Sequence, residues 1–199
     1  MDNEIVFRVL FAFFGILMMV IRIYYQKKVL PESKNTAIKG NPIHLIPGSI
    51  AALTSIIFSL EYIVAPGTFR FAYFLAYPYW LRFVGVTLLG AGIFLLGISH
   101  HHLDRSFSSF VAIKDEQAFV DTGPYRYIRH PIYTAYIMNY IGGGLLSSNV
   151  VLTVVPIMFF TLMVALRIGE EETMLVEEFG DQYRAYMKKT GRFLPLFRS

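Results

Sequence analysis

The chain contains no cysteine among its 199 residues. This absence excludes disulfide bonds, thiolate zinc sites, iron–sulfur clusters and cysteine nucleophiles. Charged residues are also scarce, at 16% of the chain where a soluble domain usually has roughly 25%, whereas 55% of the residues are hydrophobic. The formal charge of +4 is not gathered into a basic stripe interleaved with aromatic rings, so we expect no nucleic-acid partner. The composition favours a membrane protein that forms a single domain over residues 1–199.

Long hydrophobic runs predict the fold class. A bilayer core about 30 Å thick is crossed by roughly 20 apolar residues in a helix. One run, residues 132–146, is shorter than this and contains three consecutive glycines, and it forms a helical hairpin with the run that follows it. The four runs that meet or approach the required length are residues 5–25, 43–65, 79–100 and 150–168. We therefore predict an all-α integral membrane protein with five transmembrane helices.

Lysine and arginine gather in alternate connections between these spans. They follow the first span, lie between the third and the fourth, and recur in the tail, whereas the N-terminal tip carries Asp2 and Glu4. Basic connections are retained in the cytoplasm, so five spans with an external N-terminus give a self-consistent topology. Residues 67–77 are aromatic and too short to span, and we expect an interfacial connector there.

A first polar block occupies residues 122–133. Gly123-Pro124 predicts a turn, and Pro131 suits the first turn of the fourth span, where its missing N–H costs nothing. A juxtamembrane anchor of cations and rings is one interpretation. An anchor does not, however, require glycine, proline and histidine at fixed offsets, so a functional loop is the other.

A second polar block begins at the end of the last span. Arg167 and Glu171 lie four residues apart, hence on one helix face, and such a pair can be a plain surface ion pair. Yet Glu171 lies in a run of three carboxylates just below the bilayer, where anionic headgroups disfavour them. Charge at membrane depth favours a functional site.

Two further patterns have competing interpretations. His100, His101 and His102 are consecutive, so on a helix they point about 100° apart and do not converge on one metal ion; a polar end to the third span is the better interpretation. The glycines at 142–144 suit close packing of membrane helices, and a close approach to a bound cofactor is the alternative.

The two polar blocks together resemble the isoprenylcysteine carboxyl methyltransferase family and its relatives, which include phospholipid methyltransferases. The resemblance covers about half of the chain, from roughly residue 100 to the end. The pattern that carries it is Gly123-x-Tyr125, Arg129-His130-Pro131-x-Tyr133 and, after one hairpin, Glu171-Glu172-x-x-Leu175, Phe179-Gly180, Tyr183-x-x-Tyr186, Arg192 and Pro195.

This resemblance implies a helical bundle with an S-adenosylmethionine pocket at the cytoplasmic face, formed by the C-terminal half. Residues 1–100 would supply three spans, and residues 101–199 would form the catalytic region, with a helical hairpin at 132–168 and a C-terminal cytoplasmic helix. Arg167 would hold the carboxylate of the methyl acceptor, and no metal is implied. The implied cofactor-binding residues are Gln117, Ala118, Phe119, Val120, Tyr125, His130, Pro131, Ile132, Tyr133 and Glu171.

The implied reaction is methylation of the C-terminal carboxylate of an isoprenylated cysteine that enters from the bilayer. A carboxylate is ionised near neutral pH, so transfer requires alignment of two bound groups and no general base. The alternatives are a phospholipid amine N-methyltransferase, an NADPH-dependent sterol reductase-like enzyme, and a membrane scaffold or transporter. The oligomeric state stays open.

Overall fold

The structure is a computed structural model that describes residues 2–33, 42–73, 75–103 and 119–196. Within these ranges the chain is helical, and its only β-type contact is a single bridge between Ile128 and Gly191. The long helices are α1 (Asp2–Ser33), α2 (Ile46–Val64), α3 (Tyr79–Leu103), α4 (Pro131–Ser147) and α5 (Val150–Lys189), joined in part by the short 3-10 turns η1 (Pro42–Leu45), η2 (Arg70–Tyr73) and η4 (Gly123–Arg126).

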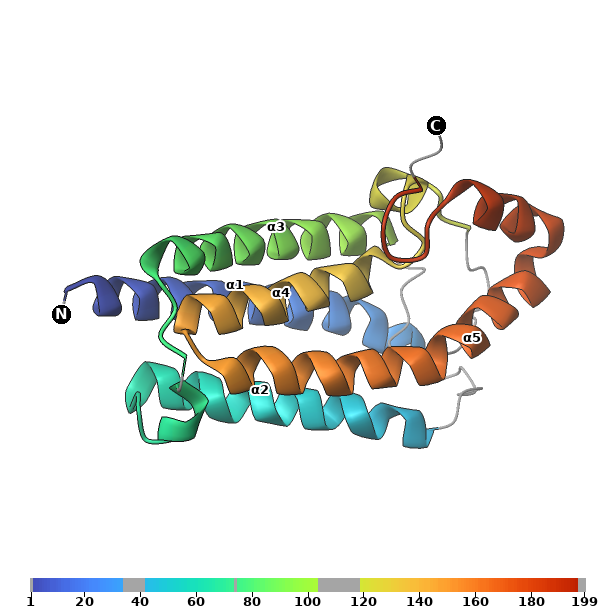
Figure 1. The fold of residues 1–199 in the computed structure, drawn as a ribbon. Coiled ribbons are helices and arrows are strands. Elements are labelled where there is room, and N and C mark those ends of the chain that lie inside the picture. Colours follow the sequence, from blue (N-terminus) through green and yellow to red (C-terminus); the bar gives the residue numbers. More distant parts are fainter. Residues whose placement is uncertain (1, 34–41, 74, 104–118, 197–199) are drawn as a thin grey trace.

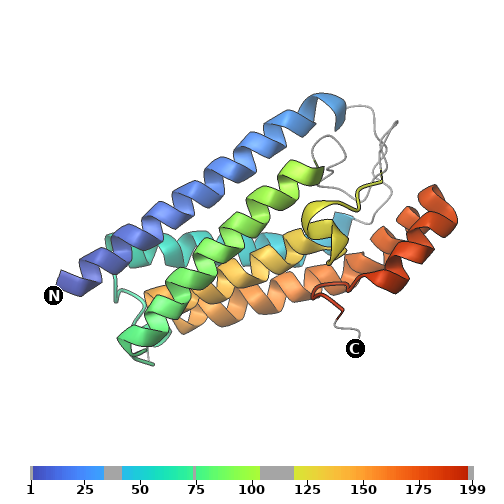
Figure 2. The ribbon, with the colours of Figure 1, turned by 90° about the horizontal axis from the view of Figure 1, so that it is seen from above.

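The five long helices form one bundle with α4 at its centre. Helix α4 packs against α3 on one side and α5 on the other, α2 lies along α5, and α1 lies on the α3 side (Figures 1 and 2). Four of the helices, α1, α2, α3 and α5, are long and apolar enough to cross a membrane. At 17 residues, α4 is roughly 25 Å long, which is short for a span, and it lies between the others. The prediction of an all-α membrane fold is confirmed.

Glycines set the close packing of α3 against α4. A Cβ atom on Gly85 would lie 2.6 Å from the backbone nitrogen of Leu146, and one on Gly142 would lie 2.8 Å from that of Leu89. Gly144 faces Thr153 of α5 just as closely. Gly142 and Gly144 lie toward the C-terminal end of α4, whereas the polar blocks meet at its N-terminal end. Helix packing therefore explains the glycines at 142 and 144.

A buried arginine joins four helices at the end of the bundle where α1 begins. The guanidinium of Arg82 in α3 lies 2.6 Å from the carboxylate of Glu4 in α1 and donates a 2.8 Å hydrogen bond to the Tyr62 hydroxyl in α2. Its Nε donates to the Leu146 carbonyl of α4, also at 2.8 Å. A charge in the bundle is thus held by an ion pair and hydrogen bonds, as a low-dielectric environment requires. These contacts explain why a charged residue, Arg82, is tolerated at the start of the third span.

Helix α5 continues well beyond its apolar part and then reverses. The interruption is at Gly180, whose φ of 56° and ψ of −131° lie outside the helical region; glycine adopts a positive φ without the penalty that a Cβ atom imposes. Residues beyond it fold back toward η4 (Figure 1). The reversal brings the end of the chain next to the start of α4, and so brings together the two polar blocks.

Candidate functional site

The first polar block is shaped by the turn that precedes α4. Gly123 has a φ of 56°, and a Cβ atom there would lie 2.4 Å from the His102 ring, so this position requires glycine on two counts. Pro124 fills the first turn of η4, where a missing N–H costs nothing. The chain then runs extended into α4, with Pro131 as its first helical residue. This local geometry directs the Tyr125 side chain into the protein, where it is buried.

The extended residues between η4 and α4 pair with the segment that follows α5. The Arg129 N–H donates to the Gly191 carbonyl at 2.8 Å, and the His130 N–H donates to the Arg192 carbonyl at 3.0 Å. The Thr134 hydroxyl adds a 2.8 Å bond to the Phe193 carbonyl. We call residues 190–196 the C-terminal strap. It holds the first polar block against the end of the second.

Consecutive glutamates of α5 have different partners because neighbouring side chains on a helix point about 100° apart. The carboxylate of Glu172 is enclosed: it accepts from Arg129 Nε at 2.9 Å and from Arg192 Nε at 3.2 Å, and His130 Nε2 lies 3.3 Å away. Only 6% of its side chain is exposed. Hydrogen bonds from cationic groups stabilise the ionised carboxylate against the cost of burial. Glu172 is therefore a structural centre of the site.

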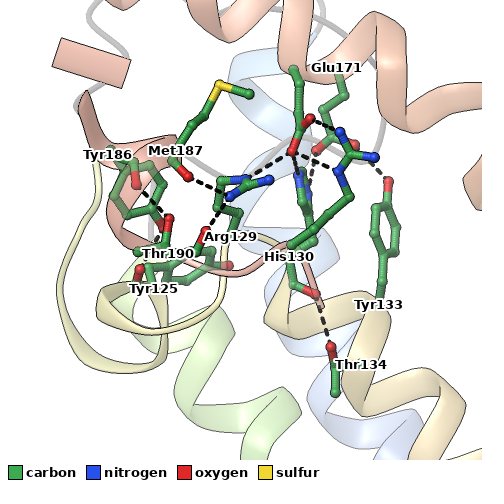
Figure 3. Close-up of polar contacts among 11 residues, drawn as sticks. Tyr125, Arg129, His130, Tyr133, Thr134, Glu171, Tyr186, Met187 and Thr190 are labelled. Atoms are coloured by element: carbon green, nitrogen blue, oxygen red, sulfur yellow. Dashed lines mark hydrogen bonds and ion pairs between the residues drawn. The ribbon is translucent and has the colours of Figure 1, made fainter. Parts of the chain in front are cut away.

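Glu171 is the more accessible of the pair. Its Oε2 atom accepts a 2.8 Å hydrogen bond from the Tyr133 hydroxyl, and its Oε1 atom lies 3.8 Å from His130 Nδ1. Its side chain is 31% exposed. The two rings beside it are stacked, with His130 and Tyr133 at a centroid distance of 5.6 Å. Figure 3 shows His130 and Tyr133 converging on Glu171 from the start of α4. The result is a partly exposed carboxylate beside two stacked aromatic rings.

Aromatic rings extend this group toward η4. The Phe119 ring packs on Phe179, Tyr183 and Tyr186 with centroid distances of 5.2–6.1 Å. The hydroxyl of Tyr186 donates to the Tyr125 carbonyl at 2.5 Å (Figure 3). Burial raises the pKa of the Tyr125 phenol above its usual value, with the charge of Glu171 and the neighbouring Tyr186 adding to the effect. Tyr125 is therefore a neutral, buried ring close to the carboxylate.

Arg167 lies one helical turn before Glu171 and is buried at 9% exposure. It therefore lies next to the turn of α5 whose Glu171 accepts from Tyr133. Phe119, Tyr125, His130, Tyr133, Glu171 and Arg167 thus lie in one region. Pro131 begins α4 beside them, and Val120 and Ile132 are half-buried, with roles that stay predictions. Gln117 and Ala118 fall outside the described residues.

Arg129, Glu172 and Arg192 are part of the sequence pattern that carries the resemblance, but the sequence alone assigned them no role. The structure makes them the ion cluster that joins the polar blocks, and it adds Phe179, Tyr183 and Tyr186 as ring partners of Phe119. The three histidines do not converge: His100 stacks on Tyr25, and His102 lies 3.2 Å from the Thr122 hydroxyl. Among the described residues there is no group of three or more potential metal ligands.

Comparisons with known proteins agree with the arrangement. The isoprenylcysteine carboxyl methyltransferase (ICMT) family model matches residues 83–177. The protein-S-isoprenylcysteine O-methyltransferase of Schizosaccharomyces pombe is 36% identical over 94 residues, which cover 46% of this chain and 40% of that protein. The mouse protein of the same name is 29% identical over 156 residues, or 78% of this chain and 53% of its own length. The chain thus spans about half the length of these curated relatives.

A solved structure shares the fold. It is described as the eukaryotic intramembrane Ras methyltransferase ICMT, and it superposes with a TM-score of 0.58 over 92% of this chain and 66% of its own, at 21% identity. The matched family residues include the first polar block, the helical hairpin and the paired glutamates. Over residues 83–177, a little under half of its length, the chain is thus similar to the isoprenylcysteine carboxyl methyltransferase family, and it shares the fold of the solved structure.

Proposed function

We propose that the chain transfers a methyl group from S-adenosylmethionine to the C-terminal carboxylate of an isoprenylated cysteine. The observation that supports this most directly is the division between the two glutamates. Glu172 is enclosed by Arg129, Arg192 and His130, whereas Glu171 keeps an accessible carboxylate beside a stacked pair of rings. A carboxylate beside aromatic rings suits a small organic ligand that carries both a positive charge and an aromatic group.

The residues of the site fit S-adenosylmethionine by their chemistry. Glu171 would pair with the ammonium of the cofactor, since a carboxylate and an ammonium form a charge-assisted contact. The rings of Tyr133, His130, Tyr125 and Phe119 provide faces that suit a sulfonium and an adenine. When bound, the cofactor supplies an electrophilic methyl group. The side chains of the protein would bind and orient the cofactor and the acceptor. The acceptor carboxylate is itself the nucleophile, so the transfer does not require one from the protein.

Arg167 is the residue we assign to the acceptor. It is a buried cation one helical turn from Glu171. A guanidinium matches a carboxylate in a bidentate geometry, and pairing inside a low-dielectric site holds that carboxylate in place. Placing two reactive groups side by side can supply much of the rate acceleration. A carboxylate acceptor is already ionised, so Arg167 has to orient it and not to activate it.

The location of the site suits a lipid-modified acceptor. The site lies where α4 begins and where the apolar part of α5 ends, so a prenyl chain in the bilayer would carry its cysteine to this depth. The basic residues at this end of the bundle put it on the cytoplasmic side by the charge bias of membrane proteins. The proposed enzyme is therefore multi-pass, with its site facing the cytoplasm and its substrate arriving laterally from the membrane.

The test uses purified chain in lipid nanodiscs with methyl-labelled S-adenosylmethionine. The acceptors are an S-farnesylcysteine derivative with a free carboxylate, the same compound with that carboxylate amidated, and phosphatidylethanolamine. We expect a base-labile methyl ester on the free carboxylate and no label on the amide. Label on phosphatidylethanolamine alone would replace our proposal with phospholipid amine methylation. S-Adenosylhomocysteine retained by the purified protein would support the cofactor independently of the acceptor.

A further inference from the structure

The C-terminal strap has an outer face that the site does not use. Its inner contacts are polar and buried: Thr190 and Gly191 lie inside, and Arg192 reaches Glu172. Its outer side chains are apolar, with Leu194 exposed at 70% and Leu196 at 50%, while Phe193 is 36% exposed and its ring also lies 6.2 Å from the His130 ring. A segment that buries its polar groups and exposes its apolar ones has the reverse of the distribution expected beside water.

The backbone of the strap is fixed at a definite height along the bundle. The Phe193 carbonyl accepts from Thr134, which lies in the first turn of α4, and residues 191 and 192 pair with residues 129 and 130 just before that turn. Figure 1 shows the strap beside the start of α4. Helix α4 enters its apolar part at this turn. The exposed leucines therefore lie at the boundary between the site and the bilayer.

Cations and another ring flank this apolar face. The Tyr127 carbonyl accepts from the Gly191 N–H, and the Tyr127 side chain is 58% exposed. The Arg126 guanidinium lies over the Tyr127 ring, 6.0 Å from its centroid. The Arg192 side chain is 45% exposed. Leucine, phenylalanine and tyrosine with arginine at the rim is the composition of segments that lie in the membrane interface, and arginine complements the anionic lipids of a cytoplasmic leaflet.

We propose that Tyr127 and the strap residues Phe193, Leu194 and Leu196 lie in the lipid interface beside α4, with Arg126 and Arg192 at the headgroups. The partner is the bilayer that holds the bundle. Arg192 on the same strap also binds Glu172. The strap, residues 190–196, would therefore be held by the ion cluster on its inner side and by lipid on its outer side.

Single cysteines test this cleanly because the chain has none of its own. Leu194→Cys would carry a polarity-sensitive fluorophore in nanodiscs, with nitroxide-labelled lipid as one quencher and iodide as the other. Phe94→Cys, on α3 at 71% exposure, is the lipid-side reference. Asp181→Cys, whose side chain is fully exposed beyond the kink of α5, is the aqueous reference. Leu196→Cys provides a second probe should the first variant fold poorly.

We expect the probe at Leu194 to be quenched by lipid nitroxide like the probe at Phe94, with emission shifted to shorter wavelength than at Asp181. Quenching by iodide like Asp181 would overturn the proposal. Protection from both quenchers would also overturn it, since that result means that protein, for example a second copy of the chain, covers the strap. None of these readouts depends on methyl transfer, so they stay informative whatever the acceptor is.

Discussion

Glu171 and Glu172 are adjacent in the chain and both lie beside His130, yet their side chains are 31% and 6% exposed: Glu171 accepts from Tyr133, whereas Glu172 accepts from Arg129. Glu172 faces the arginines that join the strap to the start of α4. Glu171 faces Tyr133 and the region next to Arg167. The helical rotation of one residue thus separates a carboxylate that holds the site together from one that we assign to the ligand.

Glu171→Gln is expected to weaken S-adenosylmethionine binding ten- to a hundredfold and to leave the folded protein intact. A charge-assisted contact contributes about 1.5–3 kcal/mol, and glutamine retains an acceptor for Tyr133 but loses the charge. Calorimetric titration measures the affinity. Glu170→Gln is the matched control, because Glu170 precedes it on the same helix and faces His44 at 3.6 Å. Equal affinity in wild type and Glu171→Gln would remove Glu171 from the site.

Glu172→Gln is expected to act on stability first. Removing one partner of a buried ion cluster costs about 3–5 kcal/mol because the remaining charges stay buried, and Arg129, with only 9% of its side chain exposed, would lose its carboxylate. Thermal unfolding in detergent should show a clearly lowered midpoint, against little change for Glu171→Gln. If both variants melted with the wild type, the structural role that we give Glu172 would be wrong.

Tyr133→Phe isolates the hydrogen bond to Glu171 from the aromatic contact. Phenylalanine keeps the ring stacked on His130 and removes only the hydroxyl, whose 2.8 Å bond orients the carboxylate. A net hydrogen bond contributes about 0.5–1.5 kcal/mol, so cofactor affinity should fall several-fold. Tyr140→Phe is the control, since Tyr140 contacts Phe160 deeper in the bundle. A loss of affinity as large in the control as in Tyr133→Phe would contradict the assignment.

Arg167→Lys separates acceptor binding from cofactor binding. Lysine keeps the charge but not the planar fork that matches a carboxylate, so methylation of a prenylcysteine derivative should drop sharply while cofactor affinity changes little. Steady-state methylation and calorimetry measure the two effects on the same preparation. A phospholipid amine as true acceptor predicts a much smaller loss, because a cation beside a protonated amine contributes no attraction. Wild-type activity in the variant on the prenylcysteine would refute the role of Arg167.

The proposed orientation can be checked with two exposed positions at opposite ends of the bundle. Cysteines replacing Arg70 in η2 and Asp181 beyond the α5 kink should be labelled from opposite faces of sealed vesicles. Asp181 should react from the cytoplasmic face. Labelling of both positions from one face would exclude the five-span topology, and labelling of Asp181 from outside would invert the proposed orientation.

The sequence by itself determined the helices, whereas only the resemblance to the family implied that the two polar blocks meet. Hydrophobic runs specify spans because an apolar helix satisfies its own backbone in lipid, and the last run was correctly expected to continue past the membrane toward Glu171. Gly123, Pro124 and Pro131 marked the turn before α4, since their backbone preferences are local. The ends of α2, α3 and α4 were placed to within a few residues, whereas α1 and α5 run well beyond the hydrophobic runs that predicted them.

Only the tertiary structure decided which side of α5 each glutamate faces and what meets it there. Arg129, Glu172 and Arg192 come from three segments that become neighbours through the reversal at Gly180. The glycine at 180 permits a positive φ, but the sequence does not say that the chain reverses there. In the same way, only the folded structure shows that the strap forms backbone hydrogen bonds with residues 127–130 beside the site. Ion clusters and strand-like pairings between distant segments arise from folding as a whole, so their partners are set by contacts that no local pattern encodes.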